Sequence, residues 1–150
     1  MSKKIMKISS KMLIVLMLFT IFTSSAFAAT GSFSKSTVKL NAIDGKQSTI
    51  SSFTSGSVLG TSPKITNVKV FLNVSSGSDP FEFYLVSPSG QTVHFEPSTK
   101  NNTYYLNDFN GLNPKGTWKA YIINSGETID PYRPFSVSTA TGIITVSYDY

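Results

Sequence analysis

The sequence predicts an all-β protein, a jelly-roll-like β-sandwich, preceded by a signal peptide that is cleaved off. Three observations support this fold class. Apolar and polar residues alternate over short stretches, clusters of turn-forming residues separate these stretches, and no stretch of useful length has helical spacing. The clearest region runs from Pro63 to Phe95, and we expect it to form the centre of the fold.

Two alternating segments make up this centre. Residues 68–74 place valine and leucine on one face, and residues 81–85 place two phenylalanines and a leucine on one face. Successive side chains of a strand point to opposite faces, so each segment is expected to bury one face. Pro80, which lacks a backbone N–H, stands directly before Phe81. We expect a widened turn or bulge to absorb it, because a one-residue slip would turn the Phe81 face outward.

Further strands are expected along the rest of the chain. The segments with strand-like character are 37–40, part of 47–59, 91–95, 117–124, 135–137 and 142–148. Within 117–124, Trp118 shares a face with two apolar residues, and we expect it in the core. Residues 30–36 are mostly small and polar and are interpreted as a flexible start, and residues 41–46 are interpreted as a turn.

The start of the chain has the three parts of a secretory signal peptide. Four lysines occupy residues 1–11, and an apolar run follows from Met12 to Phe22. Two small residues, Ala26 and Ala28, then precede a predicted cut before Ala29. The apolar run has 11 residues, whereas a transmembrane helix needs about 20. A retained membrane anchor is the alternative interpretation.

This cut sets the predicted domain organisation. Residues 1–28 are the signal peptide, residues 29–48 a flexible segment with one short strand, and residues 49–150 a single β-sandwich. The mature protein is expected to be secreted and extracellular, with no membrane attachment after cleavage.

The charge of the chain comes mostly from the signal peptide. The whole sequence has 13 basic and 8 acidic residues and a net charge of +5, but residues 29–150 hold nine basic and eight acidic residues. Nucleic-acid binding needs a basic patch on the folded domain, so no nucleic-acid partner is predicted. The sequence has no cysteine, and an exported domain without disulfides is more typical of bacteria than of small secreted eukaryotic proteins.

No pattern in the sequence indicates an enzyme. His94 is the single histidine, and it lies on the polar face of a predicted strand, where a solvated side chain is expected rather than the base of a triad. A zinc site built on histidine and cysteine is excluded by residue count. Paired carboxylates for glycoside hydrolysis are conceivable among Asp79, Glu82 and Asp108, but eight acids scattered over a loop-rich chain place some together by chance.

A calcium site in the loops is an alternative to ordinary turn chemistry. Calcium takes oxygen ligands, and Asp79 in one loop would supply them with Asp108 and Asn110 in another. Aspartate and asparagine also occupy turns because they bond their own backbone. The turn interpretation is preferred, so no cofactor is predicted, with Ca²⁺ as the alternative.

A glycan-binding face is the second alternative. Tyr104, Tyr105 and Tyr132 lie in or near predicted loops, where exposed rings would stack on sugars. Aromatic side chains also build the core and cover its edge, and this interpretation is preferred.

The strand ending in Leu85, the turn after it and the later Gly-Thr-Trp resemble the P domain of subtilisin-like proprotein convertases. The matching positions are Leu85, Ser87, Pro88, Gly90, Gly116, Trp118 and Gly142. The resemblance covers about residue 49 to the C-terminus, and it implies a jelly-roll sandwich of the galactose-binding-like superfamily.

This chain departs from the family pattern in several places. Pro80 holds the position usual for aspartate, and Asp79 lies one residue earlier, as after a one-residue insertion. Gln91 replaces a threonine, and Ala120 stands where a larger apolar residue is common. P domains usually sit beside a protease domain and stabilise it, and this sequence shows none, so the family's role does not transfer intact.

The function expected from the sequence is therefore a secreted, non-catalytic accessory or interaction module. Its expected partner is a protein or a polymer of the cell wall or cell surface. The alternatives are a secreted carbohydrate-binding protein and a small secreted hydrolase.

Overall fold

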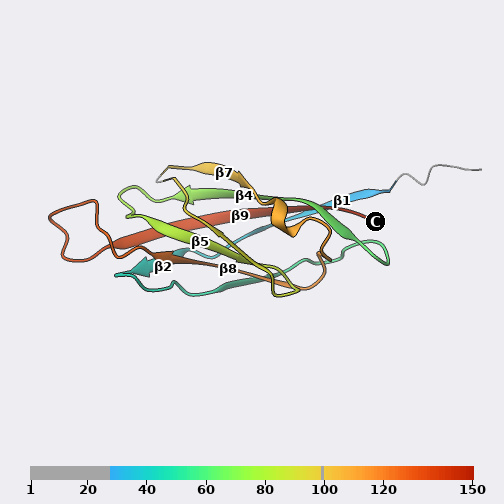
Figure 1. The fold of residues 1–150 in the computed structure, drawn as a ribbon, viewed down its shortest axis with the longest axis horizontal. Helices are drawn as coiled ribbons and strands as arrows, with labels where there is room; N and C mark the ends of the chain where they lie inside the picture. The colour runs from blue at the N-terminus through green and yellow to red at the C-terminus, as the bar shows by residue number, and fades with distance from the viewer. Residues whose placement is uncertain (1–27, 99) are drawn as a thin grey trace, which may run out of the picture.

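Two antiparallel β-sheets pack face to face in the computed structural model, which describes residues 28–98 and 100–150 (Figure 1). The first sheet has the order β1-β9-β4-β7, and β2 also pairs with β9. Its strands are β1 (Thr30–Ser36), β2 (Leu40–Ile43), β4 (Lys64–Val74), β7 (Asn102–Tyr105) and β9 (Val137–Asp149). The second sheet has the order β3-β8-β5-β6. Its strands are β3 (Ser51–Thr54), β5 (Phe81–Val86), β6 (Thr92–Phe95) and β8 (Thr117–Asn124). The predicted all-β sandwich is confirmed.

The core fills the space between the sheets. β5 and β8 alternate strictly between buried and less buried side chains, as expected for strands with one buried face. Phe81, Phe83 and Leu85 are buried behind the turn that contains Pro80, so the predicted register is confirmed. Trp118 is fully buried, its ring centroid lies 5.4 Å from that of Phe109, and its Nε1–H donates to the carbonyl of Pro114 at 3.1 Å.

The last strand, β9, is longer than expected. The sequence predicts two short strands there, at 135–137 and 142–148, but β9 is continuous over 13 residues. It continues because β4 pairs along one edge and β2 and then β1 pair along the other. Gly142 lies inside the strand, where a Cβ atom would stand 3.3 Å from Leu72. The glycine is thus a close-packing position rather than the start of a strand.

The N-terminal part of the sandwich also differs from the expectation. Residues 30–36 are not a flexible start but strand β1, which pairs with β9 from Thr30 to Ser36. Residues 40–43 form β2, so the predicted strand at 37–40 lies three residues too early. The turn is confined to Asp44 and Gly45, both with positive φ. Both errors arise because the partner strand β9, not the local pattern, sets these strands.

The predicted signal peptide lies almost wholly outside the described residues, which begin at 28. Within the described part of the chain, no helix is long and apolar enough to cross a membrane. The one helical element found there is a single 3-10 turn, η1 (Asn107–Phe109).

Candidate functional site

A long loop between β8 and β9, residues 125–136, extends beyond the sheets at one end of the sandwich (Figure 1). It carries three exposed large apolar side chains, Ile129 at 58% exposure, Tyr132 at 95% and Phe135 at 49%. Ile43 at the neighbouring end of β2 is also exposed, at 47%. Exposed aromatic and aliphatic side chains that gather on one element mark an interaction surface more often than scattered ones do.

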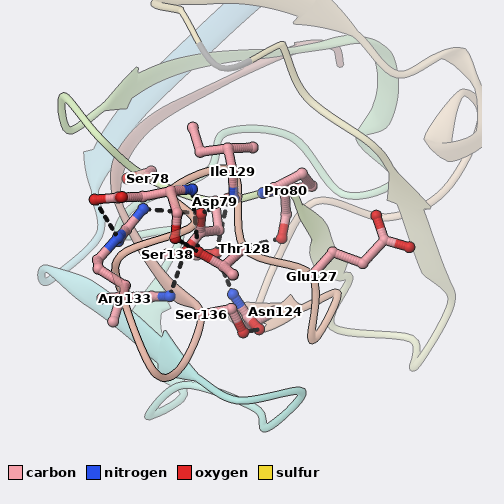
Figure 2. A network of polar contacts seen from close by, with 12 residues as sticks. Ser78, Asp79, Pro80, Asn124, Glu127, Thr128, Ile129, Arg133, Ser136 and Ser138 are labelled. Carbon is pink, nitrogen blue, oxygen red and sulfur yellow. Dashed lines mark hydrogen bonds and ion pairs between the residues drawn. The ribbon is translucent and has the colours of Figure 1, made fainter.

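The carboxylate of Asp79 holds this loop from inside (Figure 2). Oδ1 accepts hydrogen bonds from the backbone N–H of Ile129 at 2.8 Å and from Nη2 of Arg133 at 2.9 Å. Oδ2 accepts one from the backbone N–H of Val137 at 2.6 Å. Asp79 is fully buried, so its charge is compensated by these donors and by the guanidinium of Arg133.

A second group of polar side chains fixes the base of the loop. Asn124 donates through Nδ2 to Oγ of Ser138 at 2.7 Å, and that hydroxyl donates to the carbonyl of Asp79 at 2.8 Å. Oδ1 of Asn124 accepts from the backbone N–H of Gly126 at 2.8 Å and of Gly45 at 3.0 Å, and from the hydroxyl of Ser136. These bonds tie the two ends of the loop to the β4–β5 link and to the turn after β2.

The same contacts set the ionisation of Asp79. Burial by itself raises the pKa of the carboxyl, but the backbone N–H groups of Ile129 and Val137 and the charge of Arg133 outweigh it and hold the pKa below its usual value. Asp79 is therefore ionised at neutral pH, and the ion pair with Arg133 persists there.

The three residues named as calcium ligands do not meet in the structure. Asp79 follows the end of β4, whereas Asp108 and Asn110 lie in and after η1, whose following residues bond to Ile65 near the start of β4. The length of β4 puts them roughly 30 Å apart. Both oxygens of Asp79 already accept N–H donors. Among the described residues there is no group of three or more histidine, cysteine, aspartate or glutamate residues placed to hold a metal.

The three tyrosines named for glycan binding also lie apart. Tyr104 packs on Phe95 with ring centroids 4.4 Å apart, and its hydroxyl accepts from the backbone N–H of Ser98 at 2.7 Å. Tyr105, its neighbour in β7, is 63% exposed. Tyr132 lies on loop 125–136. The three rings therefore do not form one platform.

His94 belongs to an aromatic row on the outer face of the second sheet. Its ring stacks on that of Tyr84 at 5.0 Å, and Tyr84 stacks on Tyr121 at 4.8 Å. The hydroxyl of Tyr84 donates to a carboxylate oxygen of Glu82, which, with burial, raises the pKa of Tyr84 to about 12. His94 is exposed, as predicted from its place in the strand.

Apart from Gly142, which lies within β9, the residues that carry the family resemblance gather toward the end of the sandwich away from loop 125–136. Gly116 has φ 125°, and a Cβ atom there would stand 2.8 Å from Cβ of Pro88. The backbone of Gly116 bonds to Ser55 through both its N–H and its carbonyl. These motif residues shape a corner of the fold and belong to its packing.

Tyr132 was among the predicted binding residues, but Ile129, Phe135 and Arg133, the partner of Asp79, were not. Ile129 and Arg133 lie in a stretch without periodicity, and Phe135 was expected to begin a short strand at 135–137. Asp79 and Arg133 are 54 residues apart in sequence, and a single sequence has no feature that pairs them.

Comparison with solved structures finds the same sandwich in other proteins. FlhE superposes with a TM-score of 0.56 at 15% identity, over 82% of this chain and 100% of that chain. The serine protease of Aeromonas sobria gives a TM-score of 0.53 at 14% identity, over 87% of this chain and 29% of that one. A chain in the complex of that protease with the chaperone ORF2 gives 0.56 at 13% identity, over 89% and 29%.

At these identities the likeness shows the fold alone. This chain spans less than a third of the two chains from the Aeromonas structures that it matches. No family model matches the sequence. No curated protein matches it either.

Proposed function

We propose that the protein is a secreted, non-catalytic accessory module that binds a protein partner through loop 125–136. The observation that carries this proposal is the loop itself, which exposes Ile129, Tyr132 and Phe135 while Asp79 holds its backbone from inside. A loop that is already ordered loses little entropy on binding, so its exposed side chains add more to affinity.

The fold likeness supports an accessory role. The Aeromonas sobria protease has a similar sandwich over part of its chain, and it is found in a complex with a chaperone. A P-domain-like module that acts beside a separately encoded protein agrees with the resemblance seen in the sequence. The arrangement of the described residues supports this more than a glycan platform, because Tyr104, Tyr105 and Tyr132 are apart.

Capture from the producing organism tests this proposal. Residues 29–150 would be immobilised and exposed to culture supernatant and cell-wall extract, in parallel with a Tyr132→Ala/Phe135→Ser variant. We expect a protein retained by the wild type and lost with the variant. A control variant, Tyr105→Ala, removes another exposed ring, from β7, and is expected to retain the captured protein.

The outcome against the proposal is equal capture by the wild type and the loop variant, or capture of polysaccharide alone.

Incubation with peptide and glycoside substrates tests the hydrolase alternative. Turnover by the wild type that is lost in a His94→Ala variant would show an enzyme.

A further inference from the structure

A surface hollow opens next to loop 125–136, between the start of β5 and the segment that follows β6. It has a volume of about 720 Å³, and Pro80, Phe81 and Ile123 are among its apolar lining residues. Three glutamates also line it: Glu82, Glu96 and Glu127. The hollow therefore combines an apolar lining with carboxylates from three separate segments.

The three glutamates have no basic partner among the described residues. The ion pairs in that part of the chain are those of Arg133 with Asp79 and Asp130. Glu82 accepts a hydrogen bond from Tyr84, which leaves its charge uncompensated. Figure 2 shows Glu127 pointing away from the Asp79 network.

This end of the molecule is acidic as a whole. We call it the loop end: loop 125–136 with the neighbouring segments 43–46, 75–82, 96–98 and 100–101. Its charged residues are Asp44, Asp79, Glu82, Glu96, Glu127 and Asp130, with Lys46, Lys100 and Arg133. The remaining described residues carry the opposite sign, with Asp108 and Asp149 against Lys35, Lys39, Lys64, Lys69, Lys115 and Lys119. An uneven charge of this kind steers partners of complementary sign to one end.

We infer that the partner presents a segment in which lysine or arginine stands beside large apolar residues, and that this segment seats in the hollow and against loop 125–136. The apolar side chains would contact Pro80, Ile123 and Tyr132, and the basic groups would pair with the glutamates. This inference rests on the proposed function and adds the chemistry of the partner to it. Charge complementarity is what selects a basic segment over an acidic or uncharged one.

Fluorescence anisotropy with a labelled synthetic peptide, in which lysine alternates with phenylalanine, tests the inference on residues 29–150. We expect binding that weakens about tenfold in a Glu82→Gln/Glu96→Gln/Glu127→Gln variant, with the difference shrinking at high salt because salt screens exposed charges. Peptides with glutamate in place of lysine, or alanine in place of phenylalanine, are expected to bind more weakly.

A control variant, Asp108→Asn/Asp149→Asn, removes the two carboxylates of the rest of the described molecule. It is expected to bind the peptide as the wild type does, and equal weakening in both variants would overturn the inference. Capture of the natural partner by the two kinds of variant distinguishes failure of this inference from failure of the proposed function. If its capture fails with the loop variant but not with the glutamate variant, the proposed function stands and this inference fails. If neither variant changes capture, the proposed function fails.

Discussion

The carboxylate of Asp79 accepts hydrogen bonds from two backbone N–H groups and one guanidinium, all from residues 129–137. In sequence terms it is a residue of a turn before a strand. In the fold its buried carboxylate stabilises a surface loop, because its hydrogen-bond donors lie in a segment about fifty residues later in the sequence. Its position in a loop was predictable, but its bonding partners were not.

Replacing Asp79 by asparagine tests this support. The change removes the buried ion pair of Arg133, which keeps only Asp130 as a partner. It also puts an N–H donor where two backbone amides need an acceptor, so we expect the free energy of unfolding to fall by roughly 3 kcal/mol. Urea denaturation measures this loss. An Asp108→Asn variant, which changes a carboxylate without buried partners, is expected to stay near the wild type.

The low pKa of Asp79 also predicts a dependence on pH. A carboxyl whose pKa is lower in the folded state adds stability above the unfolded pKa, and this stability is lost as pH falls through the folded value. We expect the wild type to lose stability below about pH 4 and the Asp79→Asn variant to lack that component. If the free energy of unfolding fell equally with decreasing pH in the two proteins, Asp79 would not be the source of the acid-dependent stability.

Trp118 is the largest fully buried side chain of the core. Changing it to alanine removes its contact with Phe109 and leaves a cavity, so we expect a loss of about 3–5 kcal/mol in the free energy of unfolding. Chemical denaturation checks this, with Tyr132→Ala as the exposed aromatic control. A loss near zero would mean that the ring does not pack as described.

At the scale of elements, strands with one buried face were predictable and strands set by their partners were not. β8 lies where its alternation placed it, at Thr117–Asn124. β1 is built largely of serine, lysine and glycine, with Phe33 as its single large apolar residue. Its sequence therefore shows little preference for a strand over a loop. Its backbone is extended because β9 offers a free edge, and that information lies more than a hundred residues away.

The contact between two turns gives a prediction at this scale. Gly116 and Gly90 both have positive φ, but a Cβ atom at 116 would meet Pro88 at 2.8 Å, whereas one at 90 has no neighbour within 4 Å. We expect Gly116→Ala to cost more than Gly90→Ala, because both carry backbone strain of about 1–3 kcal/mol and only the first adds a clash. Equal shifts of the denaturation midpoint would show that the corner adjusts freely.

At the scale of the whole molecule, the two ends of the described chain meet. Ala29 and Tyr150 exchange backbone hydrogen bonds of 3.2 and 2.8 Å, and β1 begins one residue later. A cut before Ala29 would leave this pairing intact, whereas a cut beyond Ser36 would remove β1 from the sheet.

We therefore expect the secreted protein to begin at Ala29 or a near neighbour. Mass spectrometry of protein from the culture medium measures the start. An Ala28→Leu variant removes the small residue before the cut, so it is expected to process poorly. Medium containing protein that starts at Met1 would refute the signal peptide.

The pairing of Ala29 with Tyr150 places both ends of the sandwich on the same side of the domain. Ala29 and Tyr150 lie at the end of β9 away from loop 125–136 (Figure 1). A tether fused before Ala29 or after Tyr150 would leave the domain from the same side, so the acidic loop end would face away from the attachment point. A short linker between the termini would instead close the chain into a ring, and new ends opened elsewhere would give a circular permutant. Either design displays the loop without touching it.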